Sequence, residues 1–265
     1  MAVSWGWGVR LFDRVRSALA GGRPSVETVL DTAVVHPGDG VTGRVSVVAD
    51  RKEAALSRVT VGLVVQSEFV PVLERRMVPW SAQLWHTDLR RDVLLAPQQR
   101  LDLAFRFALP VETPVTAVGD AVLPFVVGVR TEVVVHDGQD TGDLDRLLVQ
   151  PLPSQSRVLD AFGVLGAHFR SVTVHPGRLP SLPQEFDFQQ VLVFTPPSWC
   201  ADRFERITLT FVAGPRDLCV LVTAHPRGGL IRPAAVTARW TVNHEDACVT
   251  DWASLIGGWL QGARG

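Results

Sequence analysis

Between residues 101 and 109, apolar side chains alternate with the other residues at every second position. The apolar set is Leu101, Leu103, Phe105, Phe107 and Leu109. A period of two places such side chains on one face of an extended strand, so that one face is buried and the other faces water. Pro110 and Pro114 follow, and proline ends a strand because it cannot donate to the hydrogen-bond ladder of a sheet. The pattern predicts a half-buried antiparallel strand.

The same alternation recurs along the whole chain. In the first half it predicts about seven strands, over residues 26–35, 41–47, 59–65, 92–95, 101–109, 125–136 and 144–149. In the second half it predicts strands over residues 169–174, 185–194, 206–212, 218–224 and 236–243. Seven short strands suit a sandwich of immunoglobulin size. The chain is therefore expected to be all-β, with two tandem antiparallel β-sandwich domains at residues 23–153 and 167–250.

Three short amphipathic helices are expected beside these domains. Residues 1–22 form the first, a linker at residues 154–166 forms the second, and a tail at residues 251–265 forms the third. The tail places five apolar residues on one helical face, namely Trp252, Leu255, Ile256, Trp259 and Leu260. Gly166 is expected to cap the linker helix, because glycine readily adopts the left-handed conformation that ends many helices.

Composition narrows the class of protein. A net charge of −1 argues against a general attraction to nucleic acid, and 46% hydrophobic residues indicate a folded chain. The three cysteines are widely spaced and form no Cys-x-x-Cys motif, which favours a reducing compartment. No apolar run approaches the length of a transmembrane helix, and Arg10 and Asp13 interrupt the N-terminus. We expect a cytoplasmic protein that needs no cofactor.

Several segments resemble the SpoOM sporulation-control family. They read VVHPGDGVTGRVSV, LDLAFRFALPVETPVTAV, VRTEVVVHDGQDTGDLDRLLVQPLP, VLDAFGVLG and LPQEFDF, in the family's order, and extend over roughly residues 24–225. The resemblance implies an arrestin-like fold, in which an N-terminal and a C-terminal β-sandwich lie end to end. It also implies a non-enzymatic regulatory role in the control of sporulation. The region after Pro226 matches the family poorly.

Candidate metal and polar sites are weighed against ordinary structural roles. An acidic loop of Asp137, Asp140, Asp143 and Asp145 could hold Ca²⁺, but it lacks the spacing of an EF-hand, and aspartate is common in turns. A zinc site could combine His36, His136, His175 or His225 with Cys200 or Cys219, but no local ligand spacing supports it. By analogy with arrestin-like folds, Asp143 or Asp145 could contact Arg130 or Arg146 between the domains. No catalytic motif stands out.

The helices at the two ends are the candidate contact elements. Trp5, Trp7 and Phe12 lie with Arg10 and Arg14 in a segment that could rest on an anionic membrane surface or dock in a groove of a partner. The apolar face of the C-terminal helix could bind a partner. Alternatively, either helix could cover the sheets of its own chain.

The leading hypothesis is a regulatory adaptor in sporulation, differentiation or stress regulation. It would act through contacts with protein partners, whose identity the sequence does not indicate. The alternative is a peripheral protein at the inner face of the membrane.

Overall fold

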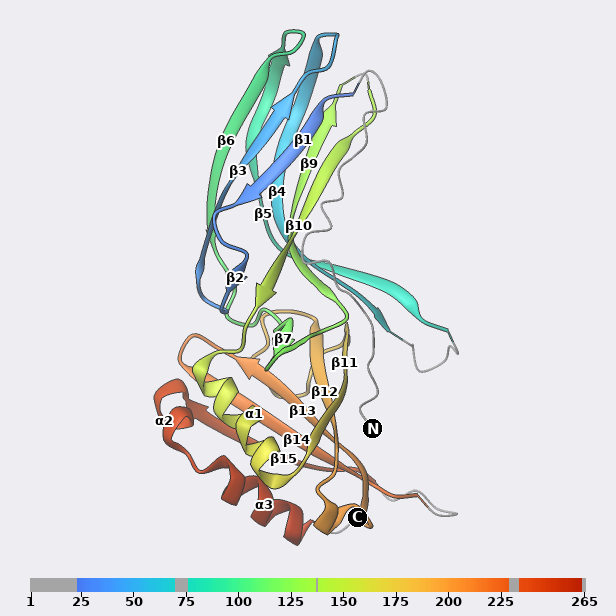
Figure 1. Cartoon of the computed structure of the whole chain (residues 1–265), viewed down its shortest axis with the longest axis vertical. Helices are drawn as coiled ribbons and strands as arrows, with labels where there is room; N and C mark the ends of the chain where they lie inside the picture. The colour runs from blue at the N-terminus through green and yellow to red at the C-terminus, as the bar shows by residue number, and fades with distance from the viewer. Residues whose placement is uncertain (1–22, 70–75, 137, 229–233, 264–265) are drawn as a thin grey trace.

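The computed structural model describes residues 23–69, 76–136, 138–228 and 234–263. Two β-rich domains lie end to end along the long axis of the molecule, joined by helix α1 (Pro153–Leu165) (Figure 1). The predicted all-β class is confirmed, and the described helices are few and short. None of these helices is long and apolar enough to cross a membrane.

The N-terminal domain is a sandwich of two sheets. A three-stranded sheet has the order β1-β3-β6, and a five-stranded sheet has the order β2-β10-β9-β4-β5. The strands are β1 (Ser25–Leu30), β2 (Val34–Val35), β3 (Gly40–Val48), β4 (Ala54–Phe69), β5 (Val78–Leu95), β6 (Arg100–Ala108), β9 (Val126–Val135) and β10 (Thr141–Val149). A small ribbon of β7 (Ala117–Val118) and β8 (Ala121–Val122) lies nearer the C-terminal domain. Alternate side chains meet between the two sheets, and Val61, Leu63 and Val65 are completely buried there.

Strands β4 and β5 are longer than the sequence predicts. They form a hairpin that runs past the sandwich as an arm beside the C-terminal domain (Figure 1). The predicted strands at 59–65 and 92–95 are only parts of β4 and β5. Two irregularities in register, between Val59 and Thr60 and between Leu63 and Val64, interrupt the alternation along the hairpin. An extra residue shifts later side chains to the opposite face, which hides a long strand from a period-two search.

The predicted first strand, residues 26–35, is two strands in the structure. β1 ends at Leu30, and β2 then pairs in parallel with β10 in the other sheet. Between them, the Asp31 amide donates to the Thr42 carbonyl at 3.0 Å. The chain therefore changes sheets at this point, which apolar patterning alone does not reveal.

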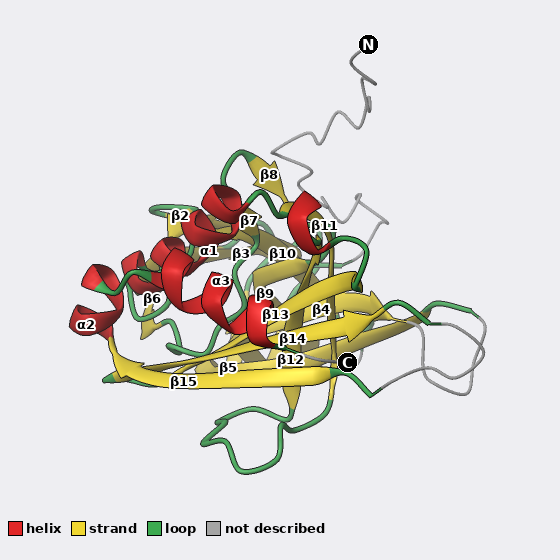
Figure 2. Ribbon diagram, turned by 90° about the horizontal axis from the view of Figure 1, so that it is seen from below, coloured by secondary structure: helices red, strands yellow, loops and turns green. Residues whose placement is uncertain are grey.

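The C-terminal domain contains one five-stranded antiparallel sheet in sequence order. Its strands are β11 (His168–Pro176), β12 (Phe188–Thr195), β13 (Phe204–Ala213), β14 (Asp217–Pro226) and β15 (Val236–Asn243). Helices α1, α2 (His244–Val249) and α3 (Trp252–Gly262) lie on one face of this sheet, and a short 3-10 helix, η1 (Ser198–Cys200), precedes β13 (Figure 2). The domain therefore differs from the expected sandwich in one respect, because its second layer is made of helices.

Side chains of α1 and α3 form the core beneath the helical layer. Phe162 of α1 packs on Phe194 of β12 with ring centroids 4.4 Å apart, and both are buried. Gly166 ends α1 in the left-handed conformation, with φ of 81°. Helix α2 is not foreseen from the sequence, although Asn243 caps it by accepting a hydrogen bond from the Asp246 amide at 2.7 Å. Six residues are too few for a helical period to stand out.

Candidate functional site

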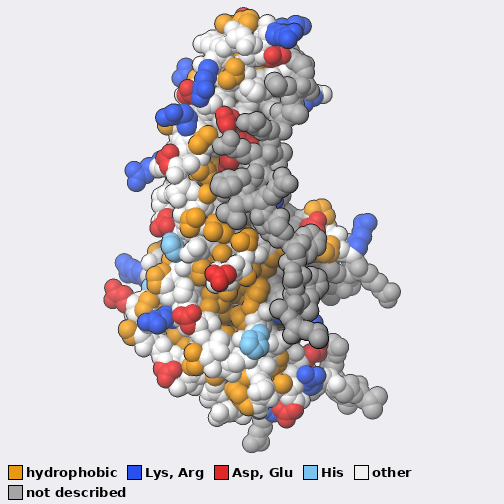
Figure 3. Space-filling view, viewed as in Figure 1, with side chains coloured by type: hydrophobic (Ala, Val, Ile, Leu, Met, Phe, Trp, Pro, Cys, Tyr) orange, Lys and Arg blue, Asp and Glu red, His pale blue; other side chains and the backbone are white. Residues whose placement is uncertain are grey.

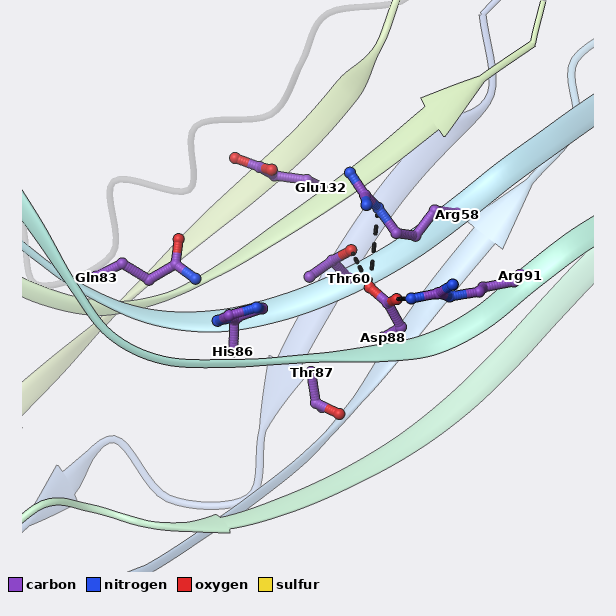
Figure 4. A pocket seen from close by; sticks show the side chains of 8 residues that line it. All are labelled: Arg58, Thr60, Gln83, His86, Thr87, Asp88, Arg91 and Glu132. Atoms are coloured by element: carbon purple, nitrogen blue, oxygen red, sulfur yellow. Dashed lines mark hydrogen bonds and ion pairs between the residues drawn. The ribbon is translucent and has the colours of Figure 1, made fainter.

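A polar hollow lies on the outer face of the five-stranded sheet of the N-terminal domain (Figure 4). It is lined by Arg58, Thr60, Gln83, His86, Thr87, Asp88, Arg91 and Glu132, from β4, β5 and β9. Thr60 is opposite Asp88 on one side and opposite Glu132 on the other. Its chain neighbours Val59 and Val61 are buried in the sandwich, so Thr60 belongs to the opposite, outward face. Strand register thus brings these polar residues into one row.

Asp88 is the centre of the charges in the polar hollow. Its carboxylate accepts hydrogen bonds from Arg91 Nε at 2.7 Å and from Thr60 Oγ1 at 3.0 Å, and Arg58 Nε lies 3.8 Å away. The hydrogen bond from Arg91 is the main reason that the pKa of Asp88 lies below its ordinary value of 3.8. A carboxylate held ionised in this way is a weak proton acceptor. The arrangement therefore favours recognition of polar groups over acid–base chemistry.

The junction between the domains is a second candidate region. Gln190 of β12 uses both ends of its amide on Val115: Nε2 donates to the carbonyl at 2.7 Å, and Oε1 accepts from the amide at 3.1 Å. From the hairpin arm, Trp80 packs against Phe188 with ring centroids 5.4 Å apart. Both contacts join the N-terminal domain to β12 of the C-terminal domain, so changes here would alter how the domains are held.

Glu112 adds a titratable group to this junction. Its Oε2 accepts a hydrogen bond from the Glu185 amide at 2.5 Å, across the boundary between the domains. Burial raises the pKa of Glu112 above its ordinary value of 4.5, and the backbone hydrogen bond opposes that shift only in part. The protonation of this carboxyl is therefore coupled to contact between the domains.

The helical layer carries a third region, in which two shallow hollows that share Ala253 lie along α1 and α3. We call it the helical groove; its residues include Ala161, Val164, Leu165, Trp199, Val249, Ala253 and Gly257. Val164 is 77% exposed and Val249 is 84% exposed, which is unusual for two apolar residues beside one groove. A Cβ added to Gly257 would lie 3.0 Å from Leu165 Cδ2, so the two helices pack closely at its floor. Hydrophobic side chains gather on the face of the molecule that carries the junction and the helices (Figure 3).

The C-terminal helix packs on its own domain. Trp252, Ile256 and Leu260 are at most 2% exposed and form part of the core. Trp259 is half-buried, and its ring meets Trp240 of β15 edge to face at 6.1 Å. Leu255 alone of the five predicted contact residues is exposed, at 38%. The face expected to bind a partner is therefore occupied by the sheet, because five apolar side chains on one helical face serve a core equally well.

The expected polar contact between the domains is absent at Asp143, which instead joins the two sheets of the N-terminal domain. Its Oδ2 accepts from the Thr28 amide at 2.8 Å. Arg130 pairs with Glu132 at 2.8 Å on the same sheet. Asp145 lies on β10 opposite Val129, also within this domain. All three residues belong to β9 and β10, which are neighbouring strands of the five-stranded sheet, so their contacts lie within the N-terminal domain.

The candidate zinc residues have other neighbours in the structure. His36 lies 3.4 Å from Asp39, and His136 lies 3.7 Å from Asp92. The ring centroids of His175 and Phe69 are 6.3 Å apart. Burial lowers the pKa of His225, and burial raises the pKa of the Cys200 thiol.

In the part of the chain that the structure describes, no three His, Cys, Asp or Glu residues form a metal-binding group. Asp137 of the acidic loop is not described, while Asp140 Oδ1 accepts from the Val135 amide at 3.2 Å, as in an ordinary turn. The predicted contact residues of the first helix also lie outside the described residues; they are Trp5, Trp7, Phe12, Arg10 and Arg14.

Comparison with known proteins identifies the relatives of this two-domain architecture. A family model described as "SpoOM protein" matches residues 12–228. The chain belongs to the SpoOM family. The sporulation-control protein spo0M of Bacillus subtilis (strain 168) is 26% identical over 187 residues, which cover 71% of this chain and 69% of that protein. The crystal structure of Spo0M, sporulation control protein, from Bacillus subtilis matches with a TM-score of 0.77 at 20% identity, over 91% of this chain and 99% of that one.

These comparisons confirm the family resemblance read from the sequence and the β-rich fold. At 20% identity the structural match supports the fold alone. The polar hollow, the Gln190 contact and the helical groove were not foreseen from the sequence. Charged residues on β4 and β5 could have indicated the hollow only after the pairing of these strands was known.

Proposed function

We propose that this SpoOM-family chain is a regulatory adaptor that acts by binding other proteins, in the control of sporulation, differentiation or stress responses, without a catalytic step of its own. Its membership of the family supports the regulatory role, since the Bacillus subtilis relative is a sporulation-control protein. The ion-paired polar hollow also fits recognition better than proton transfer.

The helical groove carries the proposal. Val164 and Val249 expose most of their surface although each lies beside a hollow with an apolar lining, and exposed apolar patches of this kind are typical of protein contact sites. Asp160 and Arg157 stand at the rim of the groove, as polar residues do around the apolar centre of an interface. We therefore assign the groove to an apolar segment of a partner protein.

Site-specific photo-crosslinking in the host tests this assignment. A photoreactive residue is placed at Val164, at Val249, or at Leu94, which is also apolar and 57% exposed but lies on the N-terminal domain. We expect one host protein to be joined at both groove positions and absent at Leu94. In addition, Val164→Asp should abolish that adduct at Val249 without changing the melting temperature. Identical adducts at all three positions would contradict the adaptor proposal.

We also propose a peripheral membrane contact through residues 1–22 as a second function. The supporting observation is in the sequence, where Trp5 and Trp7 accompany Arg10 and Arg14 in one amphipathic segment. Flotation with vesicles of anionic or neutral lipid measures this contact. Binding should require anionic lipid and should fall when Trp5, Trp7 and Arg14 are replaced by alanine together. Unchanged binding of that variant would exclude the segment as the anchor.

A further inference from the structure

The edges of the sheets differ in how well they are protected from pairing with another strand. An edge strand presents unpaired N–H and C=O groups, and natural proteins usually block them with bulges, charges, short strands or covering segments. In the N-terminal domain the outward amide of Thr28 on β1 is taken by Asp143 at 2.8 Å. β5 has irregular register and carries Arg90, Arg91 and Asp92 in succession. Both edges are therefore poor templates for a further strand.

The remaining edges of that domain, and one edge of the C-terminal sheet, are protected in other ways. β2 has two residues, and β6 carries charged residues at Arg100, Asp102 and Arg106. β11 has a register shift between Phe169 and Ser171, and the hairpin arm lies beside it, with Phe69 against His175. Each of these edges is short, charged, irregular or accompanied by another segment.

β15 is the least protected of these edges. Its eight residues pair with β14 in unbroken register, and they include neither glycine nor proline. Arg239 is its only charged residue. Among the hydrogen bonds of the described residues, no backbone group of β15 joins anything other than β14 between Val236 and Val242. Half of the N–H and C=O groups of a strand paired on one side point outward, so this edge is a regular and open template.

We propose that β15 pairs antiparallel with β15 of a second copy of this chain across a two-fold axis, joining the two five-stranded sheets into one continuous sheet. The side chains of the strand are self-complementary in this arrangement. Val236, Trp240 and Val242 are half-buried on the face that meets the helices, whereas Thr237, Arg239 and Thr241 are exposed on the other. Two such strands would place apolar residues beside apolar residues and polar residues beside polar residues.

The charge on Arg239 excludes the register centred on that residue, and we place the axis at the next residue, Trp240. Matching the two faces requires the axis to pass through a residue paired with its own copy. An axis at Arg239 would set two guanidinium groups directly opposite each other, which is unfavourable. An axis at Trp240 instead sets Arg239 opposite Thr241 and Ala238 opposite Val242 of the other copy. This register also brings the two Trp240 side chains together beside α3, whose Trp252 and Trp259 already meet Trp240 edge to face.

Self-association of this kind goes beyond the adaptor proposal and does not depend on it. It uses the edge of β15, whereas the helical groove lies between α1 and α3 on the face of the sheet. A chain could therefore form the dimer whether or not a partner occupies the groove. The two proposals can be tested separately.

Sedimentation of the purified full chain over a range of concentrations tests the pairing. We expect the mass of two chains at high concentration. Thr241→Arg places an arginine opposite Arg239 of the other copy, at two symmetry-related positions of the dimer. It should weaken association about three- to thirty-fold. Thr241→Asp should strengthen it, because aspartate then faces Arg239. Thr173→Arg, on an exposed position of β11, is the matched control and should leave the mass unchanged. A single-chain mass at all concentrations, or equal effects of the arginine and aspartate variants, would overturn the proposal.

Disulfide trapping tests the register. Chains with Ala238→Cys are mixed with chains with Val242→Cys, both on a Cys248→Ser background because Cys248 is the free cysteine that is not buried. The Trp240-centred register predicts a covalent dimer in the mixture and none in either variant alone. Crosslinking within one variant alone would overturn this register. Absence of crosslinks in a mixture that sediments as a dimer would do the same.

Discussion

Replacement of Trp252 by alanine should unfold the C-terminal domain at much lower denaturant concentration. The side chain is 2% exposed and is the largest fully buried one in the described chain. Its indole Nε1 donates to the Ala247 carbonyl at 2.8 Å, and its ring meets Trp240 at 6.2 Å. The substitution therefore removes a core contact and one hydrogen bond, and leaves a cavity between the sheet and the helical layer.

The expected loss of unfolding free energy is about 3–5 kcal/mol, as for other buried aromatic residues replaced by alanine. Trp252→Phe retains much of the ring but leaves the Ala247 carbonyl without its donor, so we expect a smaller loss of about 1–3 kcal/mol. Leu255→Ala on the same helix is the matched control. Leu255 is 38% exposed, so its loss should stay near 1 kcal/mol.

Urea unfolding followed by circular dichroism at 222 nm measures the three variants, since the described helices lie in or against the C-terminal domain. With a slope of about 1–3 kcal/mol per molar urea, the Trp252→Ala transition should move down by at least about 1 M. If Trp252 instead faced a partner, the Trp252→Ala chain alone would be as stable as the Leu255→Ala chain. Equal midpoints for these two variants would refute the placement of α3 in the core.

Three further predictions concern the junction and the sandwich. Gln190→Ala removes both hydrogen bonds to Val115, and small-angle X-ray scattering should show a wider range of interdomain distances; an unchanged profile would contradict a role of Gln190 in holding the domains. Burial raises the pKa of Glu112, so the folded protein binds the proton of this carboxyl more tightly than the unfolded chain does. The free energy of unfolding should therefore fall as pH rises from about 4.5 through the folded pKa. Glu112→Gln should flatten that slope in melting temperatures and stabilise the protein at neutral pH. The buried hydroxyls of Thr28 and Thr131 are hydrogen-bonded at 2.6 Å, and Thr131→Val leaves that of Thr28 without its partner. This variant should lose about 1–2 kcal/mol of unfolding free energy in urea, whereas replacement of both threonines by valine should cost less.

The sequence predicts the strands best where one face of a regular strand is buried. β3 and β6 follow their predicted spans closely because they pair in an uninterrupted ladder, in which Phe105 and Phe107 of β6 alternate with exposed residues. Prediction fails where geometry shifts the period, as at the two irregularities of the β4–β5 hairpin. It also fails for the C-terminal layer, because the apolar face of a sheet does not indicate whether helices or strands cover it.

The candidate sites depend on register and could not be predicted in the same way. Asp88 and Glu132 are far apart in the sequence, and both meet Thr60 only because β4 lies between β5 and β9. The Gln190 contact depends likewise on where two domains meet. The apolar face of the C-terminal helix was recognised correctly, but the same pattern is compatible with a partner groove or a core. Only the position of α3 against β15 separates these two possibilities.

The helical layer accounts for the two surfaces of the C-terminal domain that are proposed as contact sites. In the N-terminal domain each sheet covers the other, and the outward Thr28 amide at the β1 edge is taken by a side chain of the facing sheet. In the C-terminal domain three helices cover one face, and helices satisfy their own backbone, so they offer no hydrogen bonds to the edge of the sheet. The β15 edge is therefore left open, while the spaces between helices leave Val164 and Val249 exposed. A second sheet in place of the helices would remove the groove between α1 and α3, so both the adaptor proposal and the β15 pairing depend on this helical layer.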